Sequence, residues 1–178
     1  GTMLHEIGHL FALPHSRQPM DFMTRGGDHL NRVFVYADGP TAAFPRPRPF
    51  LDRDIPAFQP VSAASLVLNR WLSPDEPPGV ENSQLSAEVD KAGKTLEVSG
   101  QRPIRYVGFL VRGDVVHYVA PRALLPSGTE SPNQRDTDQL RLRLPIAELN
   151  DKFDTSAMVV RVQDDAGNLR DIPVTIPR

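Results

Sequence analysis

The stretch HEIGHLFALPH, residues 5–15, decides how the N-terminal part of this chain folds. His5 and His9 are four residues apart, so on a helix both imidazoles lie on one face and can reach the same metal ion. Glu6 lies about 100° further around the helix, where its carboxylate can reach a water on that ion without binding the ion itself. The pattern therefore predicts a helix that carries two metal ligands and a base.

The third histidine of the stretch has to come from outside this helix. Pro14 disfavours the helical conformation of Leu13, so we expect the helix to end by residue 12 or 13 and His15 to stand in a loop. Three imidazoles leave the fourth position of a tetrahedral zinc ion open for water, which is typical of catalytic zinc.

The spacing thus predicts that His5, His9 and His15 bind Zn²⁺. Glu6 is then the general base that takes a proton from the zinc-activated water during peptide hydrolysis. Two alternatives are a chance H-E-x-x-H on an ordinary helix and a purely structural zinc. A structural site, however, normally has four protein ligands and would leave Glu6 without a role.

These residues resemble the metzincin pattern H-E-x-x-H-x-x-G-x-x-H, which is followed by a Met-turn. Ala12 stands at the glycine position, so a positive φ there would cost on the order of 1 kcal/mol. Met23 lies eight residues after His15, the spacing of the Met-turn in matrixin-like members. The resemblance implies that Met23 is an apolar floor beneath the zinc site. Met20 is a weaker candidate, and both methionines can instead be core residues.

The continuation MTRGGDHLNR, residues 23–32, is similar to a family of zinc metallopeptidases found in fungi and bacteria. In that family the Met-turn runs into an Arg-Gly pair and then an Asn-Arg pair, and NRWL at residues 69–72 resembles the family's C-terminal helix. The resemblance implies the C-terminal portion of a metzincin catalytic domain without its N-terminal sheet. We therefore expect an N-terminally truncated fragment that is inactive by itself.

Other polar residues near the motif have two interpretations each. In some metzincins a tyrosine near the Met-turn donates to the oxyanion, which makes Tyr36 a candidate donor; a half-buried structural tyrosine is the alternative. His29 is either a fourth ligand or a loop cap, and three-ligand catalytic zinc favours the cap. Asp28, Asn31 and Arg32 are expected to fix the loop below the site.

Residues 37–60 hold six of the 18 prolines, which exclude a regular helix or a central strand. After Pro60, apolar residues at helical spacing predict a helix with one apolar stripe. The stripe consists of Ala64, Val67, Leu68, Trp71 and Leu72. Prolines and a glycine at residues 74–79 then mark a domain boundary.

From residue 84 onward, short β-forming runs alternate with turn residues. The expected strands are Gln84–Asp90, Lys94–Ser99, Arg105–Arg112, Val115–Val119, Gln139–Leu144, Ala157–Gln163 and Asp171–Ile176. Seven short strands in about 100 residues are typical of an immunoglobulin-like β-sandwich. A short helix is expected within residues 145–153, and His117 on the sandwich surface. The fold class is thus α+β, with a catalytic portion over residues 1–76 and an all-β accessory domain over residues 80–178.

The composition and charge of the chain exclude several classes of binding partner and metal ligand. A net charge of −2 leaves no segment basic enough for a phosphate backbone, so nucleic acid is not an expected partner. The absence of cysteine excludes disulfides and thiolate ligands. No apolar run approaches the ~20 residues of a membrane helix. The compartment stays undetermined, although a secreted or extracytoplasmic location is favoured.

Taken together, the residues favour a zinc endopeptidase that acts on a protein or peptide substrate. The β-sandwich is then expected to contact a surface or a glycan, on fold analogy alone. The alternative is an adhesion or binding protein whose metallopeptidase part is vestigial. The intact His5, Glu6, His9, His15 and Met23 favour the enzyme.

Overall fold

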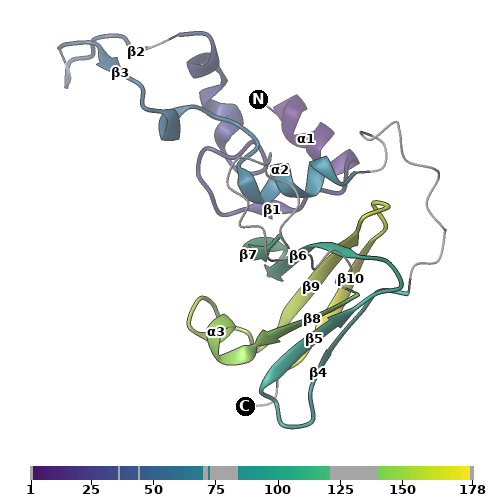
Figure 1. Ribbon diagram of the computed structural model, residues 1–178. Helices are drawn as coiled ribbons and strands as arrows, with labels where there is room; N and C mark the ends of the chain where they lie inside the picture. The colour runs from purple at the N-terminus through teal and green to yellow at the C-terminus, as the bar shows by residue number, and fades with distance from the viewer. Residues whose placement is uncertain are drawn as a thin grey trace, which may run out of the picture. The chain divides into compact units, whose positions relative to one another are not determined.

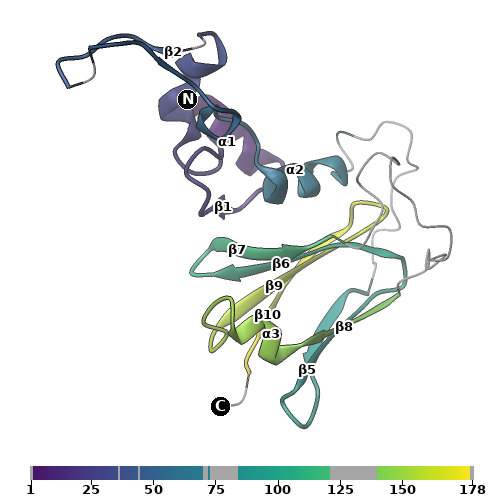
Figure 2. The same cartoon turned by 60° about the vertical axis from the view of Figure 1, so that its left-hand side comes forward.

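The computed structural model describes residues 2–35, 37–43, 45–69, 72, 84–120 and 140–176. The chain forms two compact units, Gly1–Ala63 and Ala64–Arg178. Helices and several sheets are combined in an α+β fold, as predicted (Figures 1 and 2). Among the residues described, none of the helices has the length and apolar character needed to span a membrane. The predicted domain boundary at residues 77–79 lies outside the described residues and stays a prediction.

Helix α1 (Thr2–Leu10) carries the first two histidines of the motif and ends where Pro14 predicts. Two backbone hydrogen bonds close its C-terminus, from Leu13 N to Gly8 O (3.0 Å) and from Ala12 N to His9 O (2.9 Å). This pair of bonds is a Schellman cap, whose left-handed position is usually glycine. Ala12 occupies that position with a φ of 60°, so the backbone strain anticipated from the sequence is present.

The remaining elements of the first unit are short. They are β1 (His15–Ser16), the 3₁₀ helices η1 (Gly26–Val33) and η2 (Asp52–Asp54), and the paired strands β2 (Ala37–Asp38) and β3 (Arg48–Pro49). Among its described residues before α2, the proline-rich segment therefore contains only the strand pair β2–β3 and the short 3₁₀ helix η2, as its prolines predict. In both views the β2–β3 hairpin extends as a narrow arm from the rest of this unit (Figures 1 and 2).

Arg32 holds the base of this arm. Its guanidinium lies 3.3 Å from the Asp38 carboxylate and 3.3 Å from the Asp54 carbonyl oxygen. The same group lies 4.9 Å from the centre of the Phe50 ring, within the range of a cation–π contact. Arg32 thus joins η1 to both ends of the proline-rich segment.

Helix α2 (Pro60–Val67) is shorter than the sequence predicts and runs across the division between the two units. The predicted apolar stripe does not continue along this helix, and two of its members are exposed, Val67 at 55% and Leu72 at 48%. The helix ends at Val67, so the later stripe positions do not continue its face; Trp71 lies outside the described residues. In the first unit this helix instead buries Val61 and Ser62.

The second unit contains a strand at each of the seven predicted runs. These strands are β4 (Ser86–Val89), β5 (Thr95–Ser99), β6 (Ile104–Val111), β7 (Asp114–Val119), β8 (Arg141–Pro145), β9 (Met158–Asp164) and β10 (Leu169–Val174). Within the unit they pair antiparallel in the orders β7-β6-β9-β10 and β4-β5-β8. Helix α3 (Ile146–Asn150) follows β8, within the predicted helical segment. The immunoglobulin-like topology itself stays a prediction.

One apolar core joins the two sheets of this unit. Leu96 and Val98 of β5 belong to the same buried cluster as Phe109 of β6 and Val160 and Val162 of β9. In β9 the two valines are two residues apart, so the alternation of the strand points both to one face. All residues of this cluster fall between positions 85 and 176.

Replacing Ala12 with glycine should raise the free energy of unfolding by about 0.5–1 kcal/mol, because glycine adopts a positive φ without the Cβ clash. Urea unfolding measures the change. The matched control is Ala63→Gly within α2, which should lower stability by about the same amount. A loss of stability in Ala12→Gly would contradict the left-handed cap.

A polypeptide of residues 80–178 should fold without zinc, because the apolar cluster described above lies wholly within it. We expect a soluble protein with β-type circular dichroism and one cooperative thermal transition. A disordered spectrum would show that this region is not an autonomous domain.

Candidate metal centre

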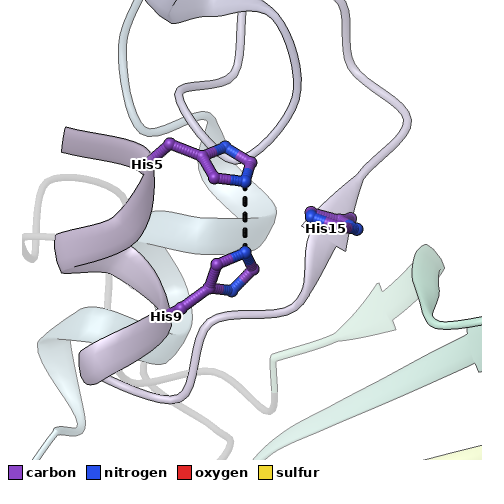
Figure 3. A group of neighbouring side chains, drawn as sticks. All are labelled: His5, His9 and His15. Atoms are coloured by element: carbon purple, nitrogen blue, oxygen red, sulfur yellow. Dashed lines mark hydrogen bonds between the residues drawn. The ribbon is translucent and has the colours of Figure 1, made fainter. Parts of the chain in front are cut away.

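The three histidines of the motif come together in the first unit. His5 and His9 project from α1, and His15 stands on β1 opposite them (Figure 3). One ring nitrogen of each lies within 4.8 Å of the others, and the ring centres are 4.7, 4.9 and 5.2 Å apart. Because the cap at Ala12 reverses the chain, the third imidazole reaches the two that the helix supplies.

Backbone carbonyls orient the two helical imidazoles. His5 Nδ1 lies 2.9 Å from the Phe22 carbonyl oxygen, and His9 Nδ1 lies 2.9 Å from the Leu13 carbonyl oxygen. A carbonyl only accepts hydrogen bonds, so both Nδ1 atoms must carry the hydrogen. In the neutral rings both Nε2 atoms then present lone pairs, which is the tautomer that a metal-binding histidine needs.

The Nε2 atoms of His5 and His9 face each other at 3.1 Å. Two lone pairs at this distance repel unless a proton or a metal cation lies between them. For two nitrogens at the usual Zn–N distance in a tetrahedral site, the expected separation is about 3.3 Å. The donor set and its spacing therefore fit a zinc ion. Among the described residues, the group of potential ligands consists of His5, His9 and His15, and His29 does not belong to it.

Glu6 follows His5 on α1 and is exposed to solvent. A carboxylate at this position is free to approach a substrate or a water from outside the helix, while the imidazoles on the adjacent face point toward β1 (Figure 3). The role of Glu6 as a base beside two ligands stays a prediction.

Met23 lies against the histidine-bearing helix α1. Its side chain is fully buried, and a Cβ added to Gly8 would overlap its sulfur. Gly8 therefore permits the close approach of α1 to this methionine. The contact places an apolar side chain against α1 at Gly8, next to His9 in the sequence.

Asp21 was not predicted as a site residue, yet it organises the turn that contains Met23. Its carboxylate is fully buried; Oδ1 accepts from Met23 N at 2.9 Å and Oδ2 accepts from Ser62 Oγ at 2.8 Å. Its carbonyl oxygen also accepts from the backbone N–H groups of Thr24 and Gly26, both at 2.9 Å. An aspartate two residues before its backbone donor is the signal of an Asx-turn, and it could have indicated this role from the sequence.

Tyr36 lies outside the described residues. Asp28, like His29, does not belong to the group of potential ligands formed by the three imidazoles. Asp28 pairs with Arg25 at 3.0 Å on the surface of η1, and the Asn31 carbonyl caps the end of η1 through Phe34 N. Asp28 therefore pairs with a residue next to η1, whereas Arg32 contacts the proline-rich segment.

His117 lies on β7, as predicted, and is only partly exposed. Its ring stacks on Phe109 at 5.8 Å and accepts a hydrogen bond from Lys152 Nζ at 3.1 Å. Burial and the neighbouring Lys152 charge lower the pKa of His117, which favours the neutral ring. It is part of the sheet surface.

A comparison with protein families gives one match, which includes the three histidines. The family model Metallopep, described as "Putative peptidase family", matches residues 1–97. The family name indicates a metal ion. No curated protein and no solved structure matches this chain. Because residues 1–97 are more than half of the 178 residues, the chain belongs to this peptidase family.

Proposed function

We propose that this protein is a zinc-dependent endopeptidase in which His5, His9 and His15 hold the ion and Glu6 is the general base. The observation that carries the proposal is the convergence of three imidazoles, two of which have their Nδ1 atoms committed to backbone carbonyls. Such outer hydrogen bonds fix ring orientation and tautomer in metal-binding histidines.

A zinc ion on three imidazoles supplies a Lewis acid for the scissile carbonyl and lowers the pKa of a water to about 7. Glu6 accepts a proton from the attacking water, whose oxygen forms a bond to the carbonyl carbon. Glu6 then returns the proton to the leaving nitrogen as the C–N bond breaks. The exposed position of Glu6 on α1 is suited to this exchange, because the substrate arrives from solvent.

The finer family assignment is part of the same proposal. The first unit would be the C-terminal portion of a metzincin-type catalytic domain, with Met23 as its Met-turn. Support comes from the burial of Met23 against Gly8 and from the left-handed residue at the glycine position of the motif. Tyr36 remains the candidate oxyanion donor. The β-rich unit would be an accessory domain of immunoglobulin-like type that contacts a surface or a glycan.

The intact protein should bind about one zinc per chain, and His5→Ala, His9→Ala and His15→Ala should each lower the zinc content sharply, because three ligands are needed for a tight site. Elemental analysis after dialysis measures the content. His29→Ala and His117→Ala are matched controls and should keep the wild-type value. Full zinc in His15→Ala would remove this residue from the ligand set.

Glu6→Gln should retain zinc and lose on the order of 10²–10⁴ in turnover, because the amide keeps the shape of the side chain but cannot take the proton. Cleavage of a broad peptide mixture by the intact protein, followed by mass spectrometry, measures turnover. Glu148→Gln, a change at another exposed helical glutamate, should be without effect. Turnover of Glu6→Gln within a few-fold of wild type would show that Glu6 is not the base. Zinc binding without any cleavage by the protein in its full natural length would favour the vestigial alternative.

A further inference from the structure

We propose that Asp21 is a positioning residue of the metal centre: its buried carboxylate holds one peptide plane so that the plane's carbonyl orients His5. The inference rests on the proposed function only for the role of His5 as a ligand. The hydrogen bonds that carry it are features of the chain itself.

The peptide between Phe22 and Met23 connects the two groups directly. Its N–H, on Met23, donates to Asp21 Oδ1 at 2.9 Å, and its C=O, on Phe22, accepts from His5 Nδ1 at 2.9 Å. A trans peptide is planar, with its N–H and C=O pointing in opposite directions. Fixing the N–H therefore fixes the direction of the carbonyl that His5 uses.

The carboxylate is itself held in one orientation. Asp21 is fully buried, and Ser62 Oγ, on α2, donates to Oδ2 at 2.8 Å. Backbone bonds to Ala57 flank it, from Phe22 N to Ala57 O and from Ala57 N to Met20 O, both at 3.1 Å. A buried carboxylate with a donor on each oxygen has little freedom to turn, because any rotation leaves an oxygen unpaired.

The same turn also reaches the strand of the third ligand. Ser16 N, next to His15 on β1, donates to Met23 O at 3.3 Å, and the Thr24 hydroxyl donates to Ser16 O. The turn closes tightly, since a Cβ at Gly26 would lie 2.5 Å from Met20 O. A change at Asp21 is therefore expected to disturb His5 most directly and His15 through β1.

The experiment compares four variants of the full chain with wild type. Asp21→Ala removes both acceptors, and Ser62→Ala removes the donor to Oδ2. Asp21→Asn keeps an acceptor for Met23 N, and its amide can donate to Ser62 Oγ. The matched control is Asp164→Ala at the turn between β9 and β10, because Asp164 is also fully buried and accepts from Ala166 N, Asn168 N and Asn168 Nδ2.

Two measurements separate positioning from plain stability. The first is zinc affinity by chelator competition, at a temperature where the metal-free chain is folded. The second is long-range ¹H–¹⁵N NMR of the His5 ring in the metal-free chain, which reports whether Nδ1 carries the hydrogen. For Asp21→Ala we expect a loss of zinc affinity of about 10–100-fold, the usual effect of removing an outer partner of a ligand. The Nδ1–H form of His5 should also lose its dominance.

Asp21→Asn should stay within about 3-fold of the wild-type affinity and keep the Nδ1–H form of His5, because the Met23 hydrogen bond survives. Asp164→Ala should lower the unfolding temperature and change neither readout. Wild-type affinity and a wild-type His5 spectrum in Asp21→Ala would overturn the proposal and leave Asp21 a purely structural residue.

Two further outcomes are also decisive. If Asp21→Ala does not fold, Ser62→Ala replaces it: a few-fold loss of zinc affinity supports the proposal, and wild-type affinity overturns it. If wild type and His15→Ala bind zinc equally, His15 is not a ligand and the three-histidine metal centre is wrong. The His5 spectrum of Asp21→Ala then still decides whether Asp21 orients that ring. Failure of the zinc-site proposal can therefore be distinguished from failure of the Asp21 proposal.

Discussion

The hydrogen bonds from the outer ring nitrogens of His5 and His9 to backbone carbonyls set the direction of the groups around the candidate metal centre. An imidazole on a helix can rotate about two side-chain bonds, and helical spacing alone does not aim its Nε2 atom. Hydrogen bonds to the carbonyls of Phe22 and Leu13 restrict the rotation of the His5 and His9 rings in the metal-free chain. A site organised in this way loses little conformational entropy when a ligand binds, which favours affinity.

Each of those two carbonyls belongs to a different local structure, one to the C-terminal cap of α1 and the other to the turn that contains Met23. The Leu13 carbonyl follows directly on the left-handed Ala12, so the residue that turns the chain toward His15 also places the acceptor for His9. The Phe22 carbonyl belongs to a turn that contacts α1 through Met23 and β1 through Ser16. The helix cap and this turn therefore account for the positions of all three imidazoles. The strain at Ala12 is a local cost that accompanies the geometry.

The positions of the histidines and of the strands could be predicted from the sequence because they depend on residues close together along the chain. Four-residue spacing placed His5 and His9 on one face, and Pro14 implied the break that brings His15 from another element. The strands of the second unit followed from short β-forming runs between turn residues, which depend on neighbours in sequence.

Features that depend on tertiary contacts were missed. The role of Asp21 requires Ser62, 41 residues away, and no periodicity connects the two. The stripe along α2 failed for a related reason: apolar spacing continues past Val67, but the helix does not. The partners of Arg32, Asp38 and Asp54 in the proline-rich segment, were likewise not indicated by the sequence. Long-range polar pairs of this kind leave little trace in a single sequence.

The packing of Met23 against Gly8 has a chemical consequence. Oxidation of methionine to its sulfoxide adds an oxygen to sulfur, and between this sulfur and the helix backbone there is no room even for a Cβ. A fully buried Met23 can thus react with peroxide only when α1 lifts from the turn, whereas Met3, 76% exposed on the same helix, reacts without any opening. The ratio of the Met23 oxidation rate to the Met3 oxidation rate therefore reports how often α1, which bears His5 and His9, opens away from Met23.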